Sequence, residues 1–475
     1  MKKRYEKRAA LSVLTAVFLL AGAFTGLAAE LRLDPGTGYI PQELFMDEVR
    51  FSMINASYWT DFPGADKVVM SQTDIQALNE DCLNNSDCNM NRLDAIEPVF
   101  NGIELRSKLA AFSDPGKLFL NGQPVNDAYY ETLRAQIANA PVSASMPVGY
   151  AFCLERCVMR SIPCAEPLSD DASDPEWDQL ALTAVLYNEP LVAYFTTANG
   201  QFTYVKSVLC DGWVPTAAIV LCHSKEEWMA ACSPEHFLIV TGDKVQTEKS
   251  YNAAHSELTL EMGNRLELCY DAQQTVDNRM NWYNYVVYAP GRGADGLYEK
   301  QKMLIPAGSD VHIGYLPMTQ EKIIEQAFKS LGARYGWGGS ENAQDCSSFV
   351  REVYQCFGLC LPRNTTWQGA INTEKVNLGA MSVPEKKKAL DGIPAGAILQ
   401  FPGHEMLYLG TRNGKYYTIN DVSSLAQDTE AGLKKMRVRT VVLNSLEDTK
   451  RANGKTWLEE LTNAIVVFGK PKGNS

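Results

Sequence analysis

The chain has 475 residues, of which 45% are hydrophobic, and its formal net charge is -12. This length is sufficient for roughly three or four domains of about 100–150 residues each. Because the charge balance is acidic and no basic segment dominates the chain, nucleic acid is excluded as an expected partner, and bulk attraction to anionic polymers is disfavoured.

Residues 1–29 have the pattern of a signal peptide. Lysines and arginines occupy five of the first eight positions, and an uncharged run from residue 9 to residue 29 ends in small residues. This pattern predicts export with cleavage. The alternative is an uncleaved anchor, because the run approaches the roughly 20 residues that span a membrane. We expect a periplasmic, cell-envelope or extracellular protein with no membrane partner after cleavage, and the sequence implies no protein partner.

Twelve cysteines would be many for a cytosolic enzyme. In an exported protein they suggest disulfides, although pairing cannot be read from spacing. The alternative is a set of buried thiols.

Residues 30–145 are rich in Asn, Asp and Pro and predict a loop-rich, partly helical domain. Helical spacing of apolar residues occurs at 75–83 and at 127–138. Nothing in this segment points to chemistry.

Short β-rich runs separated by turn residues follow, and they predict two consecutive small β-barrels at 146–235 and 236–316. Asn199 and Gly200 lie between two such runs, a pair that is typical of a tight hairpin.

Residues 317–475 predict an α+β domain. Thr319 precedes an apolar helical stripe that Gly332 closes, and a second helix begins near Asp345. Several strands follow, with a hairpin predicted at Asn413 and Gly414.

One cysteine in this last domain has the surroundings of a nucleophile. Cys346 begins the second helix after a glycine-rich loop, and His404 is the only histidine that follows it in the chain. We expect the helix N-terminus and a neighbouring imidazolium to lower the pKa of the Cys346 thiol. The histidine needs an orienting partner, for which Asn420 is the first candidate and Asp421 is the rival, since a register slip of one residue exchanges their faces.

Several of these residues also have an interpretation without a catalytic role. Cys346 could be a buried packing residue, although its neighbours Asp345, Ser347 and Ser348 are polar. Trp337 could belong to an ordinary turn or form the floor for a substrate chain. The other four histidines show no metal-ligand spacing, so we expect neither a metal nor another cofactor.

Three motifs together resemble the NlpC/p60-type cell-wall cysteine peptidases. They are residues 335–339 (Tyr-Gly-Trp-Gly-Gly), residues 345–349 (Asp-Cys-Ser-Ser-Phe) with residues 361–363 (Leu-Pro-Arg), and residues 403–410, which contain His404. The resemblance implies a papain-like α+β domain that hydrolyses the γ-D-glutamyl bond to a diamino acid in peptidoglycan stem peptides.

The resemblance also implies roles for single residues. Cys346 would be the nucleophile, His404 the general base and acid, and Asn420 the orienting residue, where many members have a second histidine. Substrate binding is implied for a further set of residues. Tyr335 would lie beside the oxyanion, and Asp345 and Ser347 would hold the free amine of the substrate. Trp337 and Arg363 would also bind the substrate.

Motifs at 160–163, 177–178, 190–192 and 212–214 resemble the first of two bacterial SH3-like domains that precede this catalytic domain in one subgroup. That barrel closes one end of the cleft, which implies stem peptides with a free N-terminal L-alanine as substrates. The predicted fold is therefore multidomain α+β, with a papain-like domain at 317–475 behind two SH3-like barrels and a loop-rich N-terminal domain. The alternatives are an amidase or acyltransferase on the same fold, or a non-catalytic wall-binding protein.

Overall fold

The structure is a computed structural model. It describes residues 32–34, 38–40, 46, 48–113, 115–252, 255–271, 275–430 and 432–469. The predicted signal segment lies outside these ranges. The chain divides into two compact units, residues 1–54 and residues 55–475. In the first unit, β1 (Arg32–Asp34) pairs antiparallel with β2 (Gly38–Ile40), and the short helix η2 spans Phe51–Ile54. Within the described ranges, no helix is both long and apolar enough to cross a membrane.

Residues 55–147 of the second unit are short elements joined by loops. They are α2 (Ser57–Thr60), β3 (Val68–Met70), α3 (Gln72–Asn84), η3 (Ser86–Cys88), η4 (Leu93–Ala95), β4 (Val99–Phe100), α4 (Gly102–Ala110), β5 (Phe119–Leu120), β6 (Gln123–Pro124), α5 (Asp127–Ala138) and β7 (Met146–Pro147). The two helices predicted here are confirmed as α3 and α5, whereas α4 was not predicted. The segment contacts two other parts of the unit. The Asn79 side chain of α3 donates to the Gly358 carbonyl at 2.8 Å, and Ile137 of α5 packs beside Trp213.

A seven-stranded sheet follows, in the order β10-β9-β13-β12-β11-β8-β14. Its strands are β8 (Gly149–Cys153), β9 (Cys157–Arg160), β10 (Ala181–Val185), β11 (Pro190–Thr196), β12 (Phe202–Lys206), β13 (Asp211–Pro215) and β14 (Ile219–Leu221), with η5 (Thr216–Ala218) between the last two. The hairpin at Asn199 and Gly200 joins β11 to β12 as predicted. Helix α6 (Lys225–Cys232) lies on β8, where the Trp228 indole donates to the Ala151 carbonyl at 3.1 Å.

The next sheet has five strands in the order β22-β21-β18-β15-β23. These are β15 (Phe237–Val240), β18 (Arg265–Leu268), β21 (Asn284–Arg292), β22 (Tyr298–Pro306) and β23 (Val311–Ile313), with separate pairs β16 (Lys244–Gln246) with β17 (Thr259–Glu261) and β19 (Thr275–Val276) with β20 (Arg279–Met280). The two sheets lie in the ranges predicted for two small barrels. Their assignment as SH3-like domains stays a prediction.

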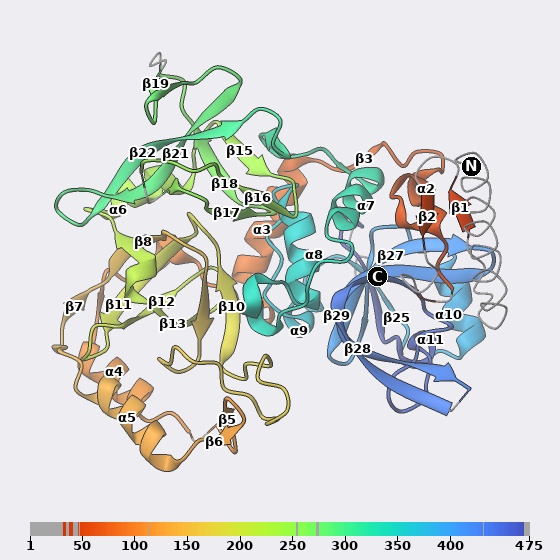
Figure 1. Ribbon diagram of the computed structural model, residues 1–475, viewed down its shortest axis with the longest axis horizontal. Helices are drawn as coiled ribbons and strands as arrows, with labels where there is room; N and C mark the ends of the chain where they lie inside the picture. Colours follow the sequence, from red (N-terminus) through yellow and green to blue (C-terminus); the bar gives the residue numbers. More distant parts are fainter. Residues whose placement is uncertain are drawn as a thin grey trace, which may run out of the picture. The chain divides into compact units, whose positions relative to one another are not determined.

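The last part combines helices with a six-stranded sheet in the order β25-β30-β26-β27-β28-β29 (Figure 1). Its elements are β24 (Met318–Thr319), α7 (Gln320–Lys329), η7 (Trp337–Asn342), α8 (Cys346–Gln355), α9 (Thr365–Gln368), β25 (Glu374–Asn377), α10 (Val383–Leu390), β26 (Ile398–Phe401), β27 (His404–Arg412), β28 (Lys415–Thr429), β29 (Gly432–Ser445), α11 (Trp457–Glu460) and β30 (Asn463–Val466). Both predicted helices are confirmed, with Thr319 capping α7 and Asp345 capping α8. Phe349, Val350 and Val353 of α8 are fully buried and anchor the helix in the core.

The glycine-rich loop η7 is pressed against β10 of the seven-stranded sheet. Gly338 and Gly339 have φ values of 61° and 84°, which favour glycine. A Cβ added at Gly338 would lie 2.6 Å from the Ala181 carbonyl oxygen, and one at Gly339 would lie 2.6 Å from the Ala184 nitrogen. Glycine is therefore required here by both conformation and space.

A buried ion pair connects the same regions. Arg156, between β8 and β9, pairs with Glu261 of β17 at 2.7 Å and donates to the Ala343 carbonyl at 3.0 Å, beside η7. One guanidinium thus connects both β-sheet regions to the loop before α8.

Gly339→Ala tests the close approach of η7 to β10. We expect it to lower the free energy of unfolding by about 1–3 kcal/mol more than Gly200→Ala does, because the added methyl group overpacks the interface. Gly200 is the matched control, since its φ is 75° and an added Cβ meets nothing within 4 Å. Chemical denaturation of both variants measures the difference, and equal losses would show that η7 tolerates a side chain against β10.

Candidate active site

Cys346 is the first residue of α8, and Asp345 is the residue that caps this helix. The Asp345 carboxylate accepts the Ser348 backbone N–H at 2.9 Å, and the Asp345 backbone N–H donates to the Ser348 hydroxyl at 2.8 Å. This reciprocal capping satisfies donors that the first turn would otherwise leave free. It also fixes the backbone at Cys346, so that the sulfur lies at the positive end of the helix dipole.

The oxygens of Asp345 are occupied by neighbouring groups of the protein. Arg363 donates to them from both terminal nitrogens, at 2.6 and 3.2 Å, and the Gly338 backbone N–H donates at 3.1 Å. The Ser347 hydroxyl donates to Asp345 at 3.1 Å and accepts from Arg363 at 2.9 Å. Burial alone would raise the pKa of Asp345, but the Arg363 charge and the hydrogen bonds lower it to about 2. Three predicted substrate-binding residues, Asp345, Ser347 and Arg363, thus form one buried network.

His404 is oriented by the residue that the sequence favours. It begins β27, and its Nε2 lies 2.9 Å from Asn420 Oδ1 on the neighbouring strand β28. The Asn420 amide is itself fixed, because it donates to Asn444 Oδ1 at 2.7 Å. An amide oxygen only accepts, so the imidazole proton lies on Nε2 and the lone pair on Nδ1.

The surroundings of His404 are apolar. Its ring packs against Phe401 and Trp457, each with a centroid separation of 5.2 Å. Burial lowers the pKa of His404 to about 4, and the Asn420 hydrogen bond opposes this shift only in part. The imidazole is therefore neutral at physiological pH.

The Cys346 sulfur accepts a hydrogen bond from the backbone N–H of Glu405, the residue next to His404. Burial, and after it the charge of Asp345, raises the pKa of the Cys346 thiol above its ordinary value. The expectation of a lowered pKa was therefore wrong, because the loss of water outweighs the helix dipole and the nearby histidine is uncharged. At rest the Cys346 thiol and the His404 imidazole are therefore both neutral.

Asp421, the rival to Asn420, does not bond His404. Both of its carboxylate oxygens are buried and have no hydrogen-bond partner within the described residues. Burial raises the pKa of Asp421 well above its ordinary value, and burial also raises the pKa of Glu405 to about 8. Glu405 is thus mostly uncharged at neutral pH.

Two predicted aromatic residues meet a third that the sequence did not assign to the site. Trp177, in the loop between β9 and β10, stacks on Trp337 with centroids 4.9 Å apart and lies parallel to Tyr335 at 6.0 Å. Trp337 is 38% exposed, whereas Tyr335 is buried. Burial, with a smaller contribution from Cys346, raises the pKa of the Tyr335 phenol, which stays protonated as a donor. The sequence placed Trp177 in a motif that resembles the first SH3-like domain, but gave it no role in the site.

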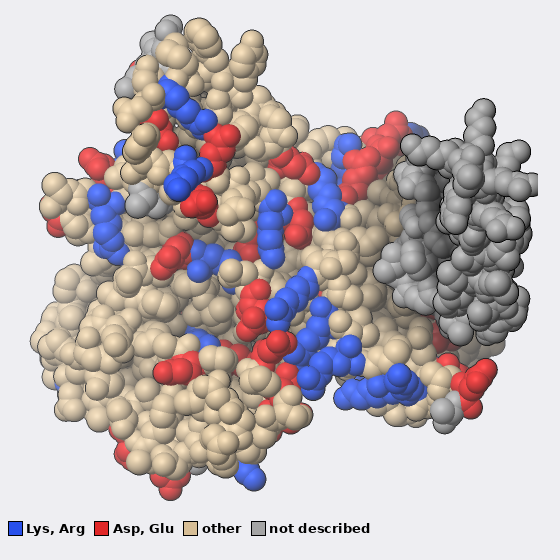
Figure 2. Space-filling model, in the orientation of Figure 1, with Lys and Arg blue, Asp and Glu red and all other residues tan. Residues whose placement is uncertain are grey.

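Two adjoining cavities form a groove at the site. One, of about 230 Å³, includes His404 and Trp457, and the other, of about 520 Å³, includes Trp177. They share Ser423, Ser424 and Lys435. The basic residues that line them are Lys435, Arg437, Arg439, Lys450 and Arg451. The acidic residues that line them are Asp170, Asp171 and Asp174. Figure 2 shows acidic and basic side chains next to each other over this part of the surface.

All twelve cysteines are free thiols, and the sulfurs of Cys153 and Cys157 lie 4.0 Å apart. Over the ranges that the structure describes, no three His, Cys, Asp or Glu side chains gather as a metal site.

Comparison with known proteins gives a consistent result for the last domain. The model of the NlpC/P60 family matches residues 332–437. The bifunctional muramidase/DL-endopeptidase CwlT of Bacillus subtilis is 26% identical over 179 residues, which are 35% of this chain and 47% of that protein. The chain therefore spans about half the length of this curated relative.

Two solved structures match parts of the chain. An NlpC/P60 endopeptidase from Photobacterium damselae subsp. piscicida is 15% identical, with a TM-score of 0.69 over 88% of this chain and 98% of the other. An NlpC/P60 family protein from Bacillus cereus is 16% identical, with a TM-score of 0.47 over 66% of this chain and 98% of the other. The similarity to the Photobacterium structure supports the fold of the chain. Together with the family match, it indicates that residues 332–437 have the papain-like NlpC/P60 fold.

Arg363→Met tests the buried ion pair with Asp345. Both side chains are about 95% buried, at 6% and 5% exposure. We expect the free energy of unfolding to fall by about 3–5 kcal/mol, because a buried carboxylate loses its counter-charge. The control is Arg92→Met, which breaks an exposed pair with Glu80 and should change little. Denaturation curves compare the two, and losses of equal size would contradict the role of Arg363.

Proposed function

Because residues 332–437 form an NlpC/P60 family domain, we propose that this protein is a cysteine endopeptidase that hydrolyses the γ-D-glutamyl–diamino acid bond of peptidoglycan stem peptides. Members of this family are cysteine peptidases and peptidoglycan hydrolases. The observation that carries the proposal is the placement of Cys346 at the start of α8, bonded to the residue next to His404, whose ring is oriented by Asn420.

The proposed reaction begins with proton transfer. His404 Nδ1 accepts the thiol proton of Cys346 as the sulfur attacks the scissile carbonyl carbon. Asn420 keeps the ring in the tautomer that this step requires. The imidazolium then donates its proton to the leaving amine, and a thioester to Cys346 remains. Water, activated by His404, hydrolyses the thioester and restores the thiol.

The negative charge of the tetrahedral intermediate needs donors that are already in place. The protonated Tyr335 phenol and the free backbone N–H groups at the start of α8 are the candidates. Trp337, stacked on Trp177, offers an exposed aromatic surface for the substrate chain.

The preference for a free N-terminal L-alanine belongs to the proposal. It is supported by the seven-stranded sheet, which lies directly against η7, the loop whose Gly338 amide donates to Asp345. A substrate ammonium would share the Asp345 carboxylate with Arg363. Export from the cytoplasm is likewise proposed, on the basis of residues 1–29 alone.

The substrate test compares a free tripeptide stem with intact sacculi, and mass spectrometry identifies the products. We expect release of the L-Ala-D-Glu dipeptide from the free peptide and little release from intact sacculi. Loss of whole stems from muramic acid would instead indicate an amidase. Binding without any product would indicate a wall-binding protein.

Substitution of the three proposed catalytic residues should have graded effects. We expect Cys346→Ala to abolish turnover without loss of fold, since the change leaves little cavity. His404→Ala should reduce kcat more than Asn420→Ala does, because Asn420 only orients the ring. Turnover of the tripeptide stem measures all three. Retained hydrolysis in Cys346→Ala would contradict the assignment of the nucleophile.

The pH dependence follows from the lowered pKa of His404. Only the neutral imidazole accepts a proton, so kcat/KM should fall on the acid side only as the pH approaches about 4. Asn420→Asp places a carboxylate at Nε2 and should move this acid limb to higher pH. An acid limb near 6.5, the ordinary value for histidine, in the unsubstituted enzyme would contradict the burial of His404 as the cause.

A further inference from the structure

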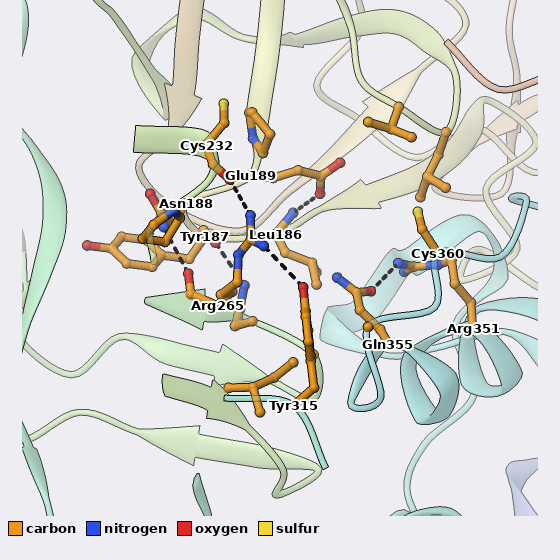
Figure 3. Close-up of a pocket in the computed structure, with 18 of the residues that line it drawn as sticks. Leu186, Tyr187, Asn188, Glu189, Cys232, Arg265, Tyr315, Arg351, Gln355 and Cys360 are labelled. Atoms are coloured by element: carbon orange, nitrogen blue, oxygen red, sulfur yellow. Dashed lines mark hydrogen bonds between the residues drawn. The ribbon is translucent and has the colours of Figure 1, made fainter. Parts of the chain in front are cut away.

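A third cavity, separate from the two that form the groove, lies at the other end of α8. Its volume is about 270 Å³, and it is lined by residues of both β-sheet regions and of α8, among them Glu189, Arg265, Arg351 and Gln355 (Figure 3). Gln355 is the last residue of α8, nine residues after Cys346. At 1.5 Å per residue it lies about 13 Å along the helix axis from the proposed nucleophile.

The α8 side of this cavity carries an open donor. Arg351 is 4% exposed, and its two terminal nitrogens donate to Gln355 at 2.9 Å and to Glu352 at 3.1 Å. Its Nε–H is buried and finds no hydrogen-bond partner in the part of the chain that the structure describes. Burial raises the pKa of Glu352 to about 8, so this carboxyl neutralises the guanidinium only in part at neutral pH. A buried guanidinium without full compensation is costly, and an added anion would relieve the cost.

The opposite side carries an open acceptor. One oxygen of Glu189 accepts the Leu186 backbone N–H at 2.8 Å. Among the described residues no cation lies within ion-pair distance of Glu189, and Arg351 influences it only at longer range. The pKa of Glu189 is raised by burial to about 6, so the carboxylate is mostly ionised at pH 7.

The third charged residue is already satisfied. Arg265 donates to the Tyr315 hydroxyl at 3.1 Å and to the Cys232 carbonyl, as Figure 3 shows. It forms a fixed wall of the cavity. Arg351 Nε and the second carboxylate oxygen of Glu189 are then the atoms of the charged lining residues to which the described residues supply no hydrogen bond.

We propose that this cavity binds a small zwitterion of amino-acid or dipeptide size, with its carboxylate on Arg351 Nε and its ammonium on Glu189. A molecule with one charge of each sign satisfies both groups at once, whereas a simple anion leaves Glu189 unpaired. The volume lies near the lower end for ligand pockets, which suits such a molecule and excludes a wall polymer. The site is separate from the residues of the proposed catalysis and does not depend on that function.

Isothermal titration calorimetry of the full-length protein with L-alanyl-L-alanine tests this site. The matched probes are N-acetyl-L-alanyl-L-alanine, which lacks the ammonium, and L-alanyl-L-alanine amide, which lacks the carboxylate. We expect saturable binding of the free dipeptide in the millimolar range or tighter, and at least tenfold weaker binding of each blocked form, because a charge-assisted hydrogen bond is lost.

Variants locate the binding. Glu189→Gln should weaken it at least tenfold, and Ala231→Phe, which fills the cavity from α6, should abolish it. Trp337→Ala, in the catalytic groove, should leave it unchanged. Absence of saturable binding, equal binding of the blocked probes, or loss of binding in Trp337→Ala but not in Glu189→Gln would each overturn the proposal.

Discussion

The site depends on the buried pair of Asp345 and Arg363. One carboxylate caps α8, receives the Gly338 amide from the glycine-rich loop, and neutralises a guanidinium that also holds Ser347. The pair therefore fixes the start of the helix, the loop in front of it and the position of Cys346 between them. Because the bonds are buried and charged, removal of either partner leaves an uncompensated charge in the interior.

Burial also sets the chemistry that the site can perform. The same loss of water that raises the pKa of Cys346 lowers that of His404, so neither group is charged at rest. Under the proposed mechanism the thiolate and imidazolium would form only when the substrate is in place, and His404 would act as a base rather than as one half of a permanent ion pair. The neutral Asn420 fits this arrangement, because a carboxylate at that position would favour the charged imidazole.

Much of the site could be predicted from sequence because it is local. The helix start at Cys346, the cap at Asp345 and the hairpin that brings His404 within hydrogen-bond distance of Asn420 all follow from short patterns. The sequence favoured Asn420 over Asp421, and the structure confirms this choice. Asp421 stayed a rival because the strand register that separates the two is fixed only in the packed sheet.

The features that could not be predicted depend on contacts between residues that are far apart in the chain. Trp177 reaches the site from a different sheet region, and the motif at 177–178 did not predict its contact with Trp337. The direction of the pKa shift at Cys346 was mispredicted because it depends on how much surrounding structure excludes water. The unpaired Arg351 Nε and Glu189 oxygen lie far apart in the chain and could be recognised only from the cavity that both residues line. The assignment of the two β-sheet regions as SH3-like domains stays a prediction.

The most direct test of the central claim is to trap the covalent intermediate. The reaction with a free tripeptide stem is quenched in acid, the protein is digested, and the peptides are sequenced by mass spectrometry. The account predicts an L-alanyl-γ-D-glutamyl group on the sulfur of Cys346. Turnover without acylation of any residue, or the acyl group on another cysteine such as Cys356 or Cys360, would contradict it.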